Sequence, residues 1–277
     1  MTAKPEFKDN LDDQLIRDIA ECISDTPPDQ MTADEKLAAR QAMTGLSSQT
    51  NLIRTFLGTH IRKLAKTIGR PVSVASIGCG TGELDYKLIG NLKDQISFYL
   101  GIDQYEENIE AFSRLAGDDS RFSLECEDFM LTRIHIEFDV MFAANFLNTF
   151  ADISAFIDKM RRINREDGIC IFATAPDNAL NNLFCMFQEH KGLAPLFSES
   201  LCKSLDGHGV SYEKYTLPCR IPVTKIDKST LDGLMQIKTS SLSEQCLEKI
   251  HQYLEQAAYQ TPDDPALDNS VDMVLIR

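Results

Sequence analysis

The sequence contains no run of about 18 consecutive apolar residues, which is close to the shortest run that crosses a membrane as a helix. Its first residues, MTAKPEFKDNLDDQ, are polar and acidic and lack the apolar centre of an export signal. Positive charge is also scarce, because 28 lysines and arginines stand against 42 aspartates and glutamates, for a formal net charge of -14. This negative charge repels the phosphate groups of nucleic acids and of membrane surfaces. Neither is therefore expected as a partner.

Paired cysteines and metal-ligand spacings are missing as well. The 8 cysteines form no C-x-x-C pair, and the 5 histidines show no metal spacing, so the sequence predicts no metal site. Several cysteines lie in apolar runs such as 169–172, which favours reduced thiols and a cytoplasmic protein. There is no G-x-S-x-G motif, so an esterase would lack its nucleophile.

Apolar sequence for a large buried core is present, since 43% of the 277 residues are hydrophobic. Residues 1–70 have apolar residues at helical spacing, which predicts helices at 15–23, 32–45 and 47–68. We interpret segment 1–70 as a helical lid that binds the substrate, and segment 71–277 as the catalytic domain.

From residue 71 onward, buried apolar strands alternate with helices, a pattern typical of a parallel, doubly wound sheet. Two further strands follow this core, and a helical insertion at about 222–268 precedes the last strand. The predicted fold is α/β, with a Rossmann-like, doubly wound, mostly parallel seven-stranded sheet. The expected strands are 72–77, 97–102, 122–125, 138–143, 168–175, 210–217 and 271–276.

The strongest motif is a glycine-dense turn between the first of these strands and the helix that follows it. Gly78, Gly80 and Gly82 have the spacing G-x-G-x-G, and glycines at such a turn let a ligand approach the main chain closely. The third glycine comes one residue earlier than in the dinucleotide fingerprint G-x-G-x-x-G, and no G-K-[ST] follows. Phosphate ligands are therefore the weaker interpretation.

Polar residues follow the next three strands at the same predicted sheet edge. Asp103 ends the second strand, where an acid in such folds binds ribose hydroxyls. Asp128 and Phe129 follow the third strand, where a carboxylate and a ring could meet an adenine, and Asn145 follows the fourth. The alternatives are that Asp103 caps the next helix, that Asp128 is a solvated loop acid and that Asn145 shapes a turn.

In this order the residues resemble the class I S-adenosylmethionine-dependent methyltransferases over roughly 72–175. The resemblance implies S-adenosylmethionine as the cofactor, with its methionine end at Gly78 to Gly82, its ribose at Asp103 and its adenine at Asp128. The cofactor residues predicted in this way are Gly78, Cys79, Gly80, Gly82, Glu83, Asp103, Gln104, Asp128, Phe129 and Asn145.

The layout of the whole chain is also similar to the histamine N-methyltransferase family. That resemblance implies that Gln49, Asn145 and Asn269 are the catalytic residues that hold the acceptor. The chain departs from that family at Gln49, which brings no negative charge to pair with a cationic amine. The expected acceptor is therefore a neutral or zwitterionic small molecule rather than histamine.

The predicted activity is direct, in-line methyl transfer to a nitrogen or oxygen of this acceptor, for which orientation supplies most of the acceleration. Three alternatives stay open at this point. They are transfer or cyclisation of the cofactor's aminocarboxypropyl group with release of methylthioadenosine, a non-catalytic cofactor-binding module, and a nicotinamide-dependent oxidoreductase. We expect a monomer or a weak homodimer.

Overall fold

The structure is a computed structural model, and it describes residues 13–25, 28–29, 31–32, 35, 38–39, 47–144, 153–189, 197–259 and 264–277. Most of the predicted helix 32–45 and all of Asn145 lie outside these residues. No helix in the described ranges is long and apolar enough to span a membrane.

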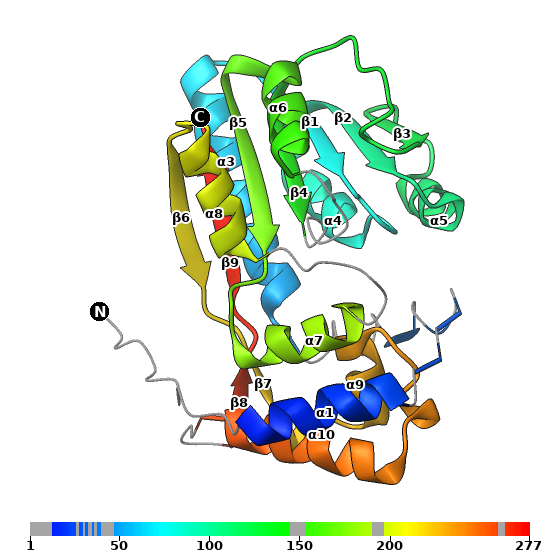
Figure 1. Cartoon of the computed structure of the whole chain (residues 1–277). Coiled ribbons are helices and arrows are strands. Elements are labelled where there is room, and N and C mark those ends of the chain that lie inside the picture. Colours follow the sequence, from blue (N-terminus) through cyan, green and yellow to red (C-terminus); the bar gives the residue numbers. More distant parts are fainter. Residues whose placement is uncertain are drawn as a thin grey trace. The chain divides into compact units, whose positions relative to one another are not determined.

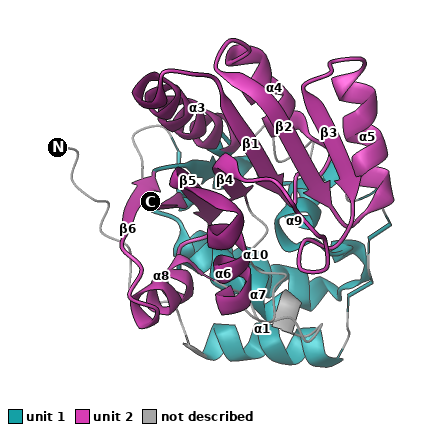
Figure 2. Cartoon of the chain, turned by 90° about the horizontal axis from the view of Figure 1, so that it is seen from above, with its two compact units in different colours: residues 1–49, 177–195, 218–270 teal, residues 50–176, 196–217, 271–277 magenta. Residues whose placement is uncertain are grey.

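Contacts along the chain divide it into two compact units, which Figure 2 colours separately. Unit 1 comprises residues 1–49, 177–195 and 218–270, and unit 2 comprises residues 50–176, 196–217 and 271–277. The helix α3, Gln49–Ile68, belongs to unit 2 from Thr50 onward.

Unit 2 contains the seven-stranded sheet that the sequence predicts (Figure 1). The strand order is β3-β2-β1-β4-β5-β9-β6, and β9 runs antiparallel to both of its neighbours while the other paired strands are parallel. The prediction of a mostly parallel, Rossmann-like sheet is confirmed. The strands are β1 (Val72–Ile77), β2 (Ile96–Asp103), β3 (Phe122–Cys126), β4 (Phe138–Ala144), β5 (Asn164–Thr174), β6 (Tyr212–Leu217) and β9 (Val271–Ile276).

Helices cover both faces of this sheet, so its inner strands such as β1, β4 and β9 are buried on both sides, while the edge strands β3 and β6 are partly exposed. Alternate residues of β1 enter different cores, with Val72 and Val74 in one cluster and Ala75 and Ile77 in the other. This alternation follows from the two-residue period of a strand. The helices of this unit after α3 are α4 (Glu83–Asn91), α5 (Glu106–Ala116), α6 (Ile153–Ile163) and α8 (Ser198–Gly207).

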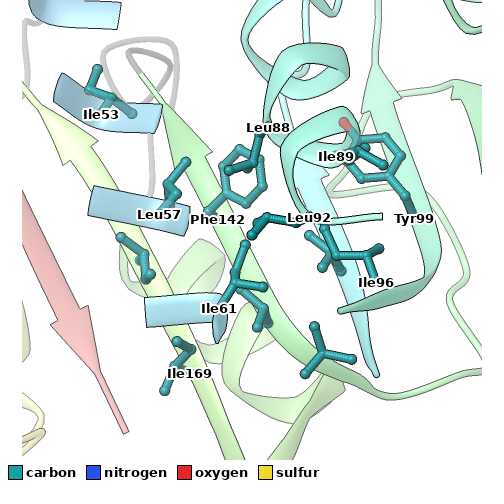
Figure 3. Close-up of a cluster of buried hydrophobic side chains, with 14 of the residues drawn as sticks. Ile53, Leu57, Ile61, Leu88, Ile89, Leu92, Ile96, Tyr99, Phe142 and Ile169 are labelled. Atoms are coloured by element: carbon teal, nitrogen blue, oxygen red, sulfur yellow. The ribbon is translucent and has the colours of Figure 1, made fainter. Parts of the chain in front are cut away.

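The helix α3 packs on the sheet through one apolar stripe. Ile53, Leu57, Ile61 and Ala65 recur every fourth residue and belong to the same core cluster as Val72 and Val74 (Figure 3). The predicted lid role of segment 1–70 stays a prediction, but this part of it stabilises the sheet.

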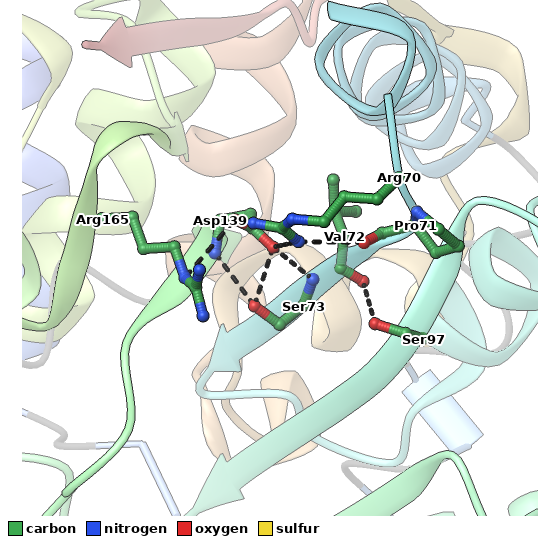
Figure 4. A network of polar contacts seen from close by, with 7 residues as sticks. All are labelled: Arg70, Pro71, Val72, Ser73, Ser97, Asp139 and Arg165. Atoms are coloured by element: carbon green, nitrogen blue, oxygen red, sulfur yellow. Dashed lines mark hydrogen bonds and ion pairs between the residues drawn. The ribbon is translucent and has the colours of Figure 1, made fainter. Parts of the chain in front are cut away.

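A polar network around the buried Asp139 carboxylate ties together the beginnings of β1, β4 and β5 (Figure 4). The Asp139 carboxylate accepts hydrogen bonds from both terminal nitrogens of Arg70, at 2.8 and 2.6 Å, and from the main chain of Ser73 at 2.8 Å. The Nε atom of Arg165 lies 3.5 Å from Oδ1 of Asp139. Burial acts to raise the pKa of Asp139, but the hydrogen bonds from Arg70 and Ser73 outweigh it and lower the pKa. Asp139 therefore keeps its charge and holds these strand ends in register.

Unit 1 is a helical body with a short antiparallel ribbon and its own apolar core. The predicted N-terminal helix is confirmed as α1, and its Leu15, Ile19 and Ile23 are buried. The ribbon pairs Ile221 with Leu267, and the sequence did not predict it because its strands are only three residues long. The elements are α1 (Asp13–Asp25), α7 (Ala179–Glu189), β7 (Arg220–Pro222), the 3-10 turns Val223–Lys225 and Thr239–Ser241, α9 (Lys228–Met235), α10 (Glu244–Ala257) and β8 (Ala266–Asp268).

Candidate cofactor and acceptor sites

The glycine turn after β1 has a backbone that favours glycine. Gly78, Gly80 and Gly82 have φ angles of 68°, 57° and 77°, in the left-handed region that L side chains rarely adopt. Gly82 is the N-cap of α4, and a Cβ atom built there would lie 2.2 Å from the ring of Phe112. At Gly80 the same atom would meet nothing within 4 Å. Packing therefore requires glycine at position 82, whereas position 80 borders open space.

Asp103 connects this turn to the end of β2. Its Oδ2 accepts a hydrogen bond from the Gly80 main chain at 2.9 Å, and its Oδ1 accepts from the Tyr105 main chain and the Asn108 side chain, both at 3.0 Å. The N-cap of α5 is Tyr105, so Asp103 is not a simple helix cap. A carboxylate offers about four acceptor positions, so three donors leave capacity for a ligand hydroxyl.

The loop after β3 carries Asp128 as an exposed carboxylate. Its Oδ1 accepts from the Met130 main chain at 2.8 Å, and no donor among the described residues reaches its other oxygen. Phe129 is only 2% exposed and packs its ring against Phe156 at a centroid distance of 5.2 Å. The Phe129 ring is therefore a core residue, and an adenine contact at this position would use its main chain.

The remaining predicted cofactor residues flank these turns. Glu83 is exposed in the first turn of α4, and Gln104 is exposed beside Asp103. Cys79 is 8% exposed and belongs to the core cluster under the glycine turn. Burial, followed by the nearby Asp85 and Asp103 carboxylates, raises the pKa of Cys79 well above its ordinary value. Its thiol stays protonated, so Cys79 packs and does not act as a nucleophile.

A buried acid beneath the glycine turn was not singled out from the sequence. Asp85 accepts a hydrogen bond from the Tyr99 hydroxyl at 2.6 Å, and both residues are buried. Burial raises the pKa of Asp85 from 3.8 to about 6, against the opposing effect of hydrogen bonds from Tyr99 and Ser76. An apolar strand residue such as Tyr99 gives no sequence signal that its hydroxyl will meet an acid.

Asp85 predicts a specific pH dependence of stability. The pKa of Asp85 is higher in the folded chain than in the unfolded chain, so the unfolded chain loses the carboxyl proton at a lower pH. The free energy of unfolding is therefore highest below pH 4 and falls as the pH rises through about 6. The loss amounts to about 3 kcal/mol. An Asp85→Asn variant keeps an acceptor for Tyr99 but cannot titrate. Urea unfolding at several pH values should show its stability rising relative to the parent between pH 4 and 7. A difference that is independent of pH would contradict the burial argument.

In unit 1, two of the three predicted acceptor residues lie together. The Gln49 side chain donates to the Asn269 carbonyl at 3.1 Å, and the Asn269 side chain donates to the Ser47 hydroxyl at 2.8 Å. The Ser47 hydroxyl lies 3.2 Å from the thiol of Cys219, and the Asn269 main chain donates to the Cys219 carbonyl at 2.9 Å. Gln49 and Asn269 are both uncharged. No donor from the described residues reaches the side-chain amide oxygen of either.

Two asparagines complete the comparison between the predicted and the observed site residues. Asn145, predicted in both sites, lies outside the described residues, directly after Ala144 at the end of β4. Asn108 was missed because nothing in its sequence context distinguishes it from other residues of the first turn of α5.

Comparisons with known proteins agree with this architecture. The model of a methyltransferase domain matches residues 71–208. Among solved structures, a protein of Bacillus halodurans C-125 has a TM-score of 0.57 at 11% identity and covers 79% of this chain and 98% of its own. The YcgJ protein of Bacillus subtilis has a TM-score of 0.54 at 14% identity and covers 78% of this chain and 97% of its own.

The plantazolicin methyltransferase BpumL, solved with a pentazolic desmethylPZN analog and S-adenosylhomocysteine, has a TM-score of 0.55 at 15% identity. It covers 95% of this chain and 97% of its own. At these identities the likeness shows a shared fold. No curated protein matches the chain significantly in sequence.

Residues 71–208 match a methyltransferase domain, which supports the class I S-adenosylmethionine-dependent methyltransferase superfamily and S-adenosylmethionine as the cofactor. The residues present fit this group, because the space beside Gly80 is open and Asp103 retains acceptor capacity next to it. The similarity to the histamine N-methyltransferases stays a prediction.

Proposed function

We propose that the chain transfers a methyl group to a nitrogen or oxygen of a neutral or zwitterionic small molecule. The observation that carries the acceptor class is the uncharged pair of Gln49 and Asn269, which matches a polar acceptor without a net charge. BpumL, solved with a pentazolic desmethylPZN analog and S-adenosylhomocysteine, supports an organic acceptor.

When bound, S-adenosylmethionine supplies an electrophilic methyl group on its sulfonium. The main chain at Gly78, Gly80 and Gly82 would hold the methionine end, Asp103 would accept the ribose hydroxyls, and Asp128 would accept from the adenine amino group. Asn145, Glu83 and Gln104 are proposed to line the same site.

The proposed transfer is direct and in-line, with orientation and exclusion of water as the main contributions of the chain. The raised pKa of Cys79 supports a direct route, since the thiol in the glycine turn does not supply a thiolate that could carry the methyl group.

Incubation with S-adenosylmethionine and fractions of a metabolite extract, followed by mass spectrometry, tests this function. The expected result is S-adenosylhomocysteine together with a small molecule that is heavier by one methyl group. Methylthioadenosine would indicate transfer or cyclisation of the aminocarboxypropyl group instead. Cofactor binding with no product from any fraction would favour a non-catalytic module, and binding of a nicotinamide nucleotide would favour an oxidoreductase.

The proposed acceptor contact predicts the effect of a charge at position 49. In a Gln49→Glu variant, a carboxylate replaces the amide that donates to the Asn269 carbonyl, so that contact is lost and a negative charge is added. Cationic amines should then become better acceptors by about tenfold relative to neutral ones, as for a charge-assisted hydrogen bond. Competition assays with matched amine and alcohol acceptors measure this ratio. An unchanged acceptor range would contradict the assignment.

We also propose a cytoplasmic, monomeric or weakly dimeric protein whose acceptor is not a nucleic acid. The charge of -14 and the 8 free cysteines support these statements. Segment 1–70 is proposed to act as a helical lid that binds the substrate.

A further inference from the structure

A buried lysine on α6 binds the turn that carries Asp128. Lys159 is 8% exposed, and its Nζ donates to the carbonyl oxygens of Phe129 and of Thr132, the latter at 2.7 Å. The same Nζ lies 4.7 Å from the centroid of the Phe129 ring. Desolvating an ammonium is costly unless it is hydrogen-bonded, so this contact fixes the position of both carbonyls.

Hydrogen bonds to Asp128 close the turn itself. The Asp128 carbonyl accepts from the main chain of Leu131 and Thr132, both at 2.9 Å, while its carboxylate accepts from Met130. Lys159 therefore bridges the turn, from the carbonyl of Phe129, directly after Asp128, to the carbonyl of Thr132. Loss of this bridge is expected to change the direction in which the Asp128 carboxylate points.

The apolar side chains of this turn pack on the core of unit 2, where Phe129 is buried and Met130 is partly buried. Residues 130–135 and α6 line a surface cavity of about 600 Å³, and Leu131 is 80% exposed. The core anchors the apolar side chains of the turn, and Lys159 adds the hydrogen bonds that hold its Phe129 and Thr132 carbonyls. Burial, followed by the charge of Arg162, lowers the pKa of Lys159, and the Asp128 carboxylate acts to raise it.

We propose that Lys159 is a positioning residue for nucleobase recognition, because it fixes the turn that presents the Asp128 carboxylate to the adenine amino group. The inference rests on the proposed contact between Asp128 and adenine. Lys159 is not proposed to touch the cofactor. Its effect is on the choice of base rather than on cofactor affinity alone.

The test compares S-adenosylhomocysteine with its deaminated analogue, in which hypoxanthine replaces adenine. The analogue presents a carbonyl oxygen where adenine presents an amino group, so a correctly placed Asp128 carboxylate repels it. Calorimetric titration of the full chain should give a preference for the adenine form of about tenfold or more. Asp128→Asn should remove most of this preference.

Lys159→Met removes the two donors at nearly constant side-chain length and should lower the preference by about tenfold. Lys159→Arg keeps a charged donor and should retain the preference. Combining Lys159→Met with Asp128→Asn should lower it no further than Asp128→Asn alone, because both changes act through one carboxylate.

The matched control is Lys214→Met, which removes another hydrogen-bonded lysine of unit 2. Lys214 contacts Asp272 at 2.9 Å and Glu199 at 3.0 Å on the opposite part of the sheet. It should lower the melting temperature and leave the base preference unchanged, so that a general loss of stability is distinguished from repositioning.

A preference that survives Lys159→Met in folded protein would overturn the inference. A parent protein that binds both ligands equally would overturn it too, although cofactor binding would stand. If the parent bound neither ligand, the proposed function would fail together with it.

Discussion

Asp103→Asn should weaken the binding of S-adenosylhomocysteine by about 100-fold. Both carboxylate oxygens of Asp103 accept hydrogen bonds from N–H donors, so an amide in either orientation would turn its NH₂ group toward a donor. The change would also remove the charged acceptor proposed for the ribose. Charged hydrogen bonds contribute about 1.5–3 kcal/mol each, and a loss of about 3 kcal/mol corresponds to this factor.

Calorimetric titration of both proteins measures the change in affinity, and circular dichroism verifies that the variant is folded. Asp119→Asn is the matched control, because Asp119 pairs with Arg121 at 2.6 Å before the start of β3 and has no proposed cofactor contact. The control should bind as the parent does. Equal affinities of the Asp103 variant and the parent would exclude the ribose assignment.

Alanine at Gly82 should lower the free energy of unfolding by about 2–5 kcal/mol. The positive φ of 77° costs a side chain about 1–2 kcal/mol, and a Cβ atom 2.2 Å from the Phe112 ring adds the cost of overpacking, about 1–3 kcal/mol. Since Phe112 belongs to the core under the turn, the ring cannot move without disturbing its neighbours.

Gly80→Ala is to be compared with Gly82→Ala, because it separates the effect on cofactor binding from the effect on stability. Its φ of 57° carries the same backbone cost, but its Cβ atom meets nothing within 4 Å, so the stability loss should stay at about 1–2 kcal/mol. The added methyl group would occupy the space proposed for the methionine end and should weaken cofactor binding by about tenfold or more. Urea unfolding and titration of both variants measure the two effects. If Gly80→Ala bound the cofactor as the parent does, the glycine turn would not be the methionine site.

The sheet was predictable because its signals are local and periodic. Buried runs such as 72–77 and 138–143 are too apolar for a one-sided strand, and the structure buries alternate residues of each in two different cores. The ribbon of β7 and β8 was not predictable, since each strand has three residues and their pairing joins segments far apart in sequence.

For the candidate cofactor site, the sequence was sufficient to predict the glycine turn and the position of one acid, Asp103. Strand ends and glycines specify where a parallel sheet exposes its carboxyl edge, which places Asp103 against Gly80. Side-chain contacts across elements carry no such pattern. Lys159 meets the Asp128 turn, and Phe129 turns into the core, through packing that spacing along the chain does not encode.

The most direct test of the whole account is a titration of the purified chain with S-adenosylmethionine and with S-adenosylhomocysteine, with the products followed by mass spectrometry. We expect saturable binding of both ligands to the same site, no methylthioadenosine, and transfer of the methyl group only once an acceptor is added. The absence of binding by either ligand would contradict it.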